Sequence, residues 1–368
     1  MIIHPKPQDP FDDPKIDPNR GQFRSPESDA GHGVDPGVDP GVDPGSREQY
    51  RGDANQIGYA QPAEIQPISI PQQTHSVHIL TVLACGVCVL IFIVLTLQKT
   101  GTLDTLSEFG VYPSFEIWDG KYWGLVTSVF VHIQILHVAF NVYWLWILGG
   151  ALEGAIGRPL WLAFFLAAAF VSSAIELGAA GTAGIGVSGV LYAMFGFMWA
   201  TKSQYPTFQQ LLPPNIIRLF IMWLGLCIVL TLAKVWNVGN AAHFSGLIFG
   251  LSVGALFVSK RRKNLAAATL VLTCVAAMTS LVWCPWSATW AAKKGYDAHK
   301  NRDYARAVVW YQKSLDLGGE PQFALENMAL AYRAMSDQNK WSETLERLRK
   351  IDPKAAQELE DTEKSSAP

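Results

Sequence analysis

The stretch SVHILTVLACGVCVLIFIVLTLQ, residues 76–98, contains no Asp, Glu, Lys or Arg. Because a helix needs about 20 apolar residues to cross the core of a bilayer, this stretch predicts a membrane-spanning helix. Further stretches of this kind follow at residues 122–152, 159–175, 177–201, 219–233, 235–259 and 265–292. The sequence therefore predicts an all-α polytopic membrane protein with seven spans.

The charged residues lie almost entirely outside these spans. Residues 78–259 hold six Lys or Arg and six Asp or Glu, out of 29 and 31 in the whole chain. A soluble protein of this size surrounds its core with charge, so this distribution argues against a soluble enzyme. The net charge of -2 offers no basic surface for nucleic acid. All five cysteines fall within apolar spans and show no zinc-site spacing.

Composition divides the chain into successive parts. We expect a disordered tail over residues 1–77, a core of six spans over 78–260, a seventh span over 264–288, a small soluble helical segment over 291–355 and a disordered C-terminus over 356–368. The tail holds 12 of the 21 prolines and a GVDPGVDPGVDPG repeat, which cannot sustain a helix. The tail can serve as a spacer or as a docking site for a partner.

The helical segment resembles tetratricopeptide repeats. Residues 303–315 have the spacing of a packed helix face after Gly295, and residues 329–353 form a more degenerate copy. Tyr304 and Trp341 are 37 positions apart, against about 34 in such repeats. An unrelated helical hairpin that packs on itself or on the membrane remains the alternative. We expect this segment to bind a protein partner and to lie outside the catalytic unit.

The positively charged loops predict the orientation of the chain. With a cytoplasmic N-terminus, the inner loops would hold most of the basic residues: Arg158, Lys202, Arg218 and the cluster at 260–263. The outer loops would hold only Lys99, Lys121 and Lys234. Seven crossings then place the C-terminus outside, and a bacterial cytoplasmic membrane is the expected location.

Polar side chains are costly inside lipid, so those that interrupt the spans mark candidate functional positions. They are His132, His137 and Asn141 in the second span, Ser188 in the fourth and His243 in the sixth. These spans cross in the same direction, and each polar group lies in the first half of its span. The groups can therefore meet at one depth below the outer surface, as a site requires.

Ser188 stands between Gly186 and Gly189 at the point where an apolar helix begins. A hydroxyl there lies beside the free N–H groups and the positive end of the helix dipole. Glycine on both sides permits close approach of another backbone. Serine needs an adjacent base to act as a nucleophile, and His243 can accept its proton at neutral pH.

Two features can hold His243 against Ser188. Gly246 and Gly250 form the small-xxx-small pattern that lets two membrane helices touch closely. Tyr192 lies one turn after Ser188, where its ring can pack on the imidazole.

His137 and Asn141 are also one turn apart and share a helix face. Two donors aimed at one point can hold the oxygen that becomes negative when an amide is attacked. His132 precedes His137 by five residues and therefore points elsewhere, towards a structural hydrogen bond in the preceding loop.

Taken together, these residues resemble the rhomboid family of intramembrane serine proteases. The resemblance covers residues 78–260 and rests on His132, His137-x-x-x-Asn141, LGGALE at 148–153, Gly186-x-Ser188-Gly189 with Tyr192, and Ala242-His243-x-x-Gly246-x-x-x-Gly250. The seventh span, with Ser188 in span four, is similar to the six-plus-one arrangement of that family. The implied fold is a six-helix rhomboid core plus a seventh C-terminal helix.

The resemblance also implies the chemistry. Ser188 would be the nucleophile and His243 the general base, without a third acidic member, a cofactor or a metal. His137, Asn141 and the backbone N–H of Ser188 would form the oxyanion hole. The substrates would be single-span membrane proteins, cut beside a small residue where their helix is destabilised near the outer face.

One position departs from the family. A Trp-Arg pair is usual in the first outer loop, whereas here Trp123, nine residues before His132, is followed by Gly124. The change does not touch the chemistry. It concerns how this loop is anchored in the outer leaflet.

The sequence leaves three other functions to consider. A catalytically silent rhomboid-like scaffold would bind membrane clients, but such relatives typically lose the serine or the histidine. A metal or haem protein would use His132, His137 and His243, although the first two do not share a helix face. A transporter needs more acidic groups for an ion relay than Glu176 and Glu153, and we expect Glu153 at the membrane interface.

Overall fold

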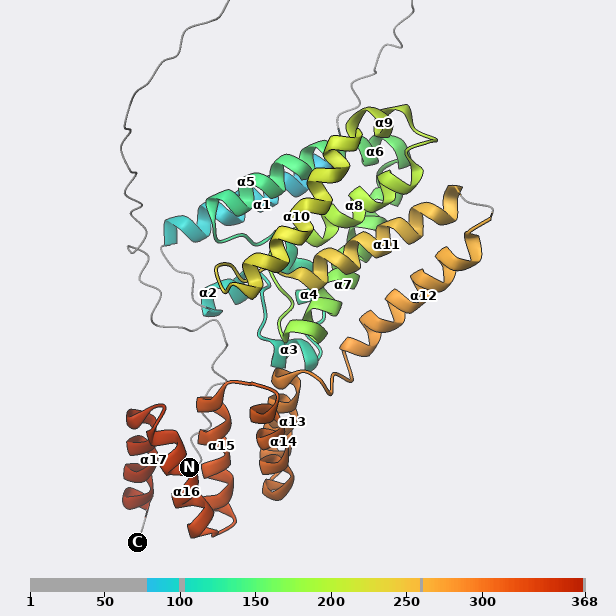
Figure 1. The fold of residues 1–368 in the computed structure, drawn as a ribbon. Helices are drawn as coiled ribbons and strands as arrows, with labels where there is room; N and C mark the ends of the chain where they lie inside the picture. Colours follow the sequence, from blue (N-terminus) through green and yellow to red (C-terminus); the bar gives the residue numbers. More distant parts are fainter. Residues whose placement is uncertain (1–77, 99–102, 259–260, 367–368) are drawn as a thin grey trace, which may run out of the picture. The chain divides into compact units, whose positions relative to one another are not determined.

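The computed structural model describes residues 78–98, 103–258 and 261–366, and every regular element in these ranges is a helix (Figure 1). The membrane part consists of α1 (Ile79–Gln98), α5 (Ile135–Trp144) continued by η2 (Leu145–Gly149) and α6 (Gly150–Ile156), α7 (Arg158–Ala180), α8 (Ser188–Thr201), α9 (Pro206–Leu211), α10 (Pro214–Leu232), α11 (Asn240–Val258) and α12 (Lys263–Ser280). Six helical stretches of the described chain are long and apolar enough to cross a membrane. The predicted all-α polytopic membrane fold is confirmed. The tail predicted for residues 1–77 lies outside the described residues.

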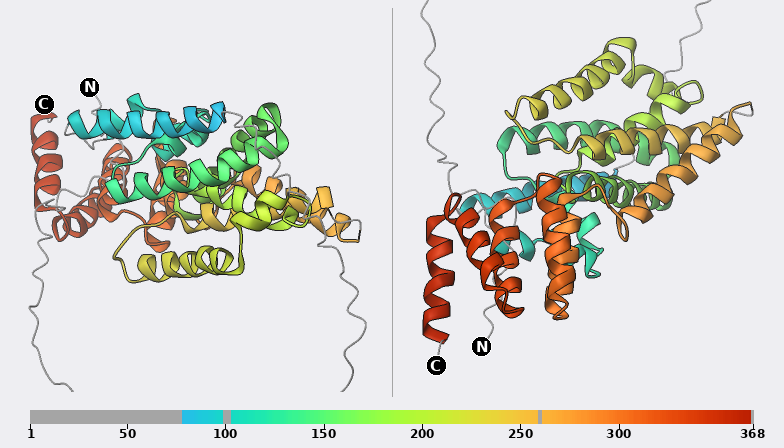
Figure 2. Two further views of the ribbon diagram at one scale, coloured as in Figure 1. Left: turned by 90° about the horizontal axis from the view of Figure 1, so that it is seen from above. Right: turned by 60° about the horizontal axis from the view of Figure 1, so that its bottom comes forward.

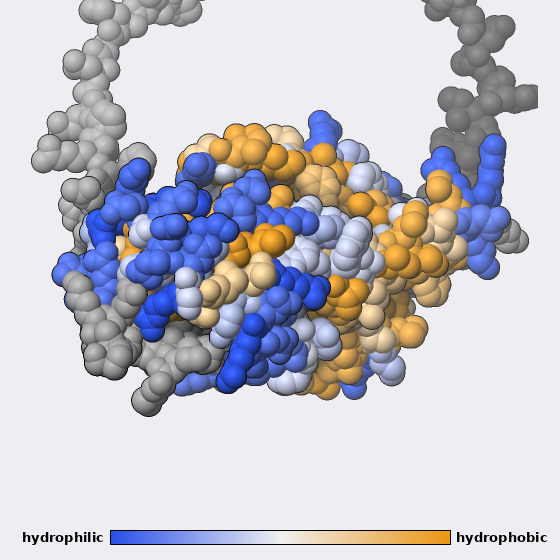
Figure 3. All heavy atoms as spheres, turned by 90° about the horizontal axis from the view of Figure 1, so that it is seen from below, coloured by the Kyte–Doolittle hydropathy of each residue, from blue (hydrophilic) through white to orange (hydrophobic). Residues whose placement is uncertain are grey.

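Large apolar side chains remain exposed along these helices. Leu97 of α1 is 76% exposed, Met222 of α10 71% and Leu272 of α12 68%. On the face drawn in Figure 3, hydrophobic residues gather over the membrane helices and hydrophilic residues over the C-terminal helices. Figure 2 shows α10 at the edge of the bundle, in keeping with its three buried side chains. Lipid contact accounts for such apolar surfaces.

The helix that begins at Ser188 is shorter than the fourth span predicted over residues 177–201. α7 continues to Ala180, and α8 begins only at Ser188, which leaves it 14 residues long. Eleven of these residues are buried, because α7 and α11 pack against α8. A helix surrounded by protein does not have to match the thickness of the lipid.

The second span also differs from the stretch predicted over residues 122–152. Its first part belongs to a loop between α1 and α5, here called the first loop, which contains α2 (Leu103–Glu108), α3 (Ser114–Trp118), α4 (Gly124–Thr127) and the 3-10 turn η1 (Ser128–Phe130). Tertiary hydrogen bonds hold this loop: the Thr127 hydroxyl donates to the Gly110 carbonyl at 2.6 Å, and the Gly186 N–H donates to the Ser128 carbonyl at 3.3 Å. The span itself runs from Ile135 to Ile156 and includes a π-helical turn.

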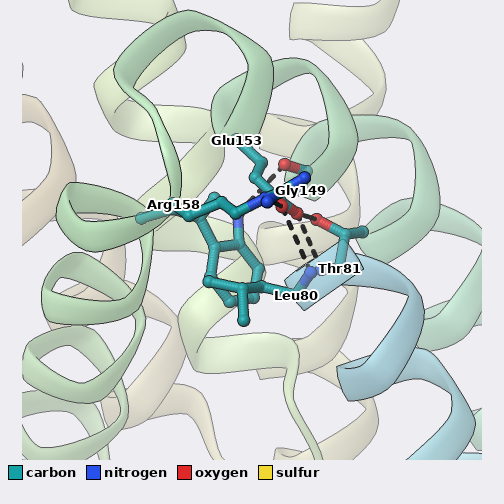
Figure 4. Close-up of polar contacts among 6 residues, drawn as sticks. Leu80, Thr81, Gly149, Glu153 and Arg158 are labelled. Carbon is teal, nitrogen blue, oxygen red and sulfur yellow. Dashed lines mark hydrogen bonds and ion pairs between the residues drawn. The ribbon is translucent and has the colours of Figure 1, made fainter. Parts of the chain in front are cut away.

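The carboxylate of Glu153 joins the start of α1 to α6 (Figure 4). It accepts hydrogen bonds from the N–H groups of Leu80 and Thr81 at 3.1 and 2.8 Å, and Arg158 lies 3.6 Å away. The first N–H groups of a helix have no partner within it, so a buried carboxylate caps them well. Only 2% of the Glu153 side chain is exposed, so protein encloses the carboxylate at this end of the span.

The last spans differ from their predicted boundaries for local reasons. α11 begins at Asn240 rather than at residue 235. α12 ends at Ser280, short of the predicted end at 288, and residues 281–287 form a non-helical junction. Pro285 cannot continue a helix, and Ser287 caps the next one by accepting a hydrogen bond from the Trp290 N–H.

Five helices follow the junction: α13 (Ala288–Lys300), α14 (Tyr304–Asp316), α15 (Pro321–Ala334), α16 (Gln338–Arg349) and α17 (Pro353–Ser366). Each packs on the next around two small apolar cores. Gly295 permits the first contact, because a Cβ there would lie 2.6 Å from the Tyr311 ring. The disorder predicted for residues 356–368 is wrong as far as Ser366, since α17 packs on α16.

Candidate active site

Ser188 is the first residue of α8, as the sequence indicates. The loop before it contains Gly186, whose φ is +96°. A side chain at this position would be strained by the backbone, and its Cβ would lie 2.6 Å from Cε1 of His137. Glycine is therefore required at position 186, two residues before the serine.

His243 of α11 meets Ser188 directly. Its Nε2 lies 2.7 Å from the Ser188 Oγ, and the histidine is only 4% exposed. Its other ring nitrogen, Nδ1, has no hydrogen-bond partner among the described residues. Within the described chain, the arrangement is thus a serine–histidine pair with no carboxylate bonded to the far nitrogen of the imidazole.

Close contact between α8 and α11 brings the pair together. A Cβ at Gly246 would lie 2.1 Å from the Gly189 carbonyl oxygen, and one at Gly250 would lie 1.9 Å from that of Ala193. Any side chain at either position would push the helices apart. Gly189 is equally restricted, because its Cβ would meet the Ser172 hydroxyl at 2.7 Å.

Tyr192 packs beside the imidazole. Its ring centroid lies 4.8 Å from that of His243, with 35° between the planes. The Tyr192 hydroxyl donates to the Phe220 carbonyl of α10 at 3.1 Å. The tyrosine is therefore held at both ends and restricts the orientation of His243.

His137 and Asn141 occupy one face of α5, beside Gly186 in the loop before Ser188. His137 reaches the Gly186 backbone, as described above. The side-chain amide of Asn141 donates to the His137 carbonyl at 3.0 Å, and its oxygen is buried without a partner among the described residues. One N–H of the Asn141 amide is thus used within its own helix, and the second remains for a ligand.

His132 and Trp123 differ in their relation to the site. The Nδ1 of His132 lies 3.2 Å from the Phe130 carbonyl, in the preceding loop. Its ring nevertheless contacts His137, with 4.8 Å between the centroids. Trp123 stays in the first loop, where it is 54% exposed and packs on Tyr112. An arginine in place of Gly124 would not fit there, since a Cβ would lie 2.9 Å from the Tyr112 ring.

Sequence reasoning did not assign Glu176 to this site. The residue is 5% exposed near the end of α7, and its carboxylate accepts a hydrogen bond from the Ala242 N–H at 2.9 Å. It therefore caps the start of α11 directly before His243. An acidic residue in an apolar span is the signal that points to it. Among the described residues, no group of three His, Cys, Asp or Glu is arranged to hold a metal ion.

The chain is similar in sequence to known proteins. Residues 119–260 match the rhomboid domain. The chain is 32% identical over 186 residues to the rhomboid protease GlpG of Haemophilus influenzae. These aligned residues make up 50% of this chain and 93% of that protein. Identity is 31% to the GlpG protease of Serratia proteamaculans and 32% to that of Yersinia pseudotuberculosis. The chain spans 60% of the length of each of these two proteins. The chain therefore belongs to the rhomboid family.

Proposed function

We propose that this protein is an intramembrane serine endopeptidase in which Ser188 is the nucleophile and His243 the general base. The observation that carries the proposal is the 2.7 Å approach of the His243 Nε2 to the Ser188 Oγ at the start of a buried helix. The membership of this chain in the rhomboid family and its similarity to rhomboid proteases support peptide-bond hydrolysis as the reaction class.

The reaction follows from this geometry. As the Ser188 Oγ attacks the substrate carbonyl, its proton moves to the His243 Nε2. The C–N bond then breaks, the imidazolium returns this proton to the leaving amine, and an acyl-enzyme forms. Water deprotonated by His243 releases the acid and restores Ser188. Because no carboxylate of the described chain bonds to Nδ1, the Tyr192 ring orients the imidazole.

Negative charge develops on the substrate oxygen during both steps. The free N–H groups at the start of α8 lie beside Ser188 and favour that charge. His137 and the second N–H of the Asn141 amide supply further donors from α5. These groups form the proposed oxyanion hole.

The proposed substrates are single-span membrane proteins whose helix unwinds near the outer face, with a small residue at the cut. A reporter of this kind, reconstituted with the purified enzyme, tests the proposal. Ser188→Ala and His243→Ala should each abolish cleavage, and the double variant should be no worse, because the pair acts as one unit. Ser252→Ala, a buried serine further along α11, should cleave normally. Cleavage that persists in Ser188→Ala would exclude this mechanism.

We also propose that the N-terminus is cytoplasmic, in a bacterial membrane, and that the C-terminal helices lie outside. One contact supports a shared side for the first loop and these helices: the Asp119 carboxylate lies 2.7 Å from the Lys293 Nζ. If the first loop and the C-terminal helices lie on one side, the chain must cross the membrane an even number of times between them. The number is even when the short helix α8 is counted as a crossing. A cysteine introduced at Ser336 should react with a membrane-impermeant thiol reagent in intact cells. Reaction only after permeabilisation would contradict this orientation.

We propose that the C-terminal helices form tetratricopeptide-like pairs and bind a protein partner. The stretch from α13 to α16 offers two successive helix pairs. Cross-linking in cells through Val309, which is 67% exposed on α14, should trap the same partner in wild type and in Ser188→Ala. Absence of any trapped protein would argue against this role.

A further inference from the structure

The junction after α12 and the helices α13 to α17, residues 281–366, are here called the C-terminal extension. This extension contacts the end of α7, close to the loop that leads to Ser188. The last carbonyls of a helix have no partner within it. The indole N–H of Trp286, in the junction after α12, donates to the Gly178 carbonyl at 2.8 Å. Because an unpaired carbonyl is costly inside a membrane protein, this bond ties the end of α7 to the junction.

The serine loop, residues 181–187, is held from both ends. At its start, Gly181 has φ +75°, and a Cβ there would lie 2.3 Å from the Thr289 Oγ1 of α13. The Ser114 hydroxyl of the first loop donates to the Gly181 carbonyl. At its end, the Gly186 N–H donates to Ser128. The first loop and the start of α13 thus enclose the backbone that positions the nucleophile.

α13 and the first loop also hold each other. Lys293 is buried, with 5% of its side chain exposed, and it pairs with Asp119 at 2.7 Å and Asp297 at 2.5 Å. Burial by itself lowers the pKa of Lys293, but the two carboxylates outweigh it and raise the pKa above its usual value. Phe115 adds ring contacts to Tyr296 and Phe323, with centroids 5.9 and 5.8 Å away. These contacts hold the first loop, in which the arginine expected after Trp123 is absent.

We infer that Trp286 is a positioning residue for Ser188 and that the C-terminal extension belongs to the catalytic unit. The inference rests on the proposed peptidase function. Without the indole bond, the Gly178 carbonyl loses its partner and the serine loop can shift. A displacement of about 1 Å at a reacting group can lower a rate about 100-fold. The expectation that this extension lies outside the catalytic unit is replaced by this assignment.

The test uses the full-length protein and a pair of matched variants. Trp286→Phe keeps an aromatic ring and removes the N–H donor. Trp283→Phe makes the same change on a ring that is 55% exposed three residues earlier. Trp286→Phe should lower kcat about tenfold, less than the loss from a full displacement of about 1 Å. KM should stay the same, and Trp283→Phe should match wild type in both constants.

Hydrogen exchange separates a failure of this inference from a failure of the proposed function. Exchange over residues 181–187 should accelerate in Trp286→Phe and not in Trp283→Phe, whatever reaction the protein catalyses. If exchange and kcat are both unchanged in Trp286→Phe while Ser188→Ala is inactive, the inference is wrong and the peptidase assignment stands. If Ser188→Ala still cleaves, the peptidase assignment is wrong, and the exchange result alone decides whether Trp286 holds the loop.

A second pair covers the case in which Trp286→Phe does not fold. Lys293→Met removes the link to Asp119, and the carboxylates it leaves behind are partly solvated, since Asp119 is 62% and Asp297 37% exposed. This variant should accelerate exchange over residues 114–119 and lower kcat. Lys294→Met, at the neighbouring position, should do neither. Equal behaviour of the two lysine variants would overturn the inference.

Discussion

The carboxylate of Glu153 accepts two hydrogen bonds from Thr81, one from the backbone N–H and one from the hydroxyl, each 2.8 Å long. The two residues are 72 positions apart, and the contact fastens the first membrane helix to the second (Figure 4).

Thr81→Val keeps the shape of the side chain and removes its hydroxyl. It should lower the free energy of unfolding by about 1–3 kcal/mol, because the buried carboxylate loses one donor. Unfolding in mixed micelles measures this change. Thr96→Val, on the exposed side of α1 where the hydroxyl bonds only to its own helix, is the matched control and should change stability little. Equal losses in the two variants would contradict the role of Glu153.

Gly250→Ala should separate α8 from α11. The added Cβ would meet the Ala193 carbonyl oxygen at 1.9 Å, so the helices must move and the Ser188–His243 contact must lengthen. We expect cleavage to fall at least 100-fold and the free energy of unfolding to fall by about 1–3 kcal/mol, the usual cost of overpacking. Gly225→Ala on α10 is the control, because nothing lies within 4 Å of its Cβ. Normal cleavage by Gly250→Ala would show that the contact tolerates a methyl group.

Asn141→Ala tests the oxyanion donors. If the free N–H of this amide stabilises the developing charge, kcat should fall about 10²–10³-fold with partial activity left. Because the same amide also bonds to the His137 carbonyl, stability is measured in parallel. A loss of stability without a loss in kcat would assign Asn141 to helix packing alone.

Glu176→Ala tests the cap on α11. Loss of the carboxylate leaves the Ala242 N–H unpaired next to His243. The expected result is a kcat about tenfold lower with little change in KM, a cost in the range of a lost helix cap. Glu176→Gln keeps an oxygen acceptor and should recover most of the rate. If both variants are equally slow, the negative charge matters rather than the hydrogen bond.

The sequence by itself determined the membrane class and most of the residues that meet at the site. Spans are readable because the thickness of the lipid imposes a length of apolar residues on each of them. Ser188 and His243 can be identified as candidate site residues from the sequence because polar groups are rare in such stretches. The glycines at 246 and 250 predict close packing because only small residues let two helix backbones touch.

Only the tertiary structure decided where helices end inside apolar sequence. Residues 122–130 are as apolar as a span, yet they belong to the first loop, because Thr127 and Ser128 make hydrogen bonds to distant backbone groups. α8 needs only 14 residues because protein rather than lipid surrounds it. Trp286 reaches Gly178 across 108 positions. Such contacts depend on which helices become neighbours, and a pattern within one span does not say which helix lies next to it.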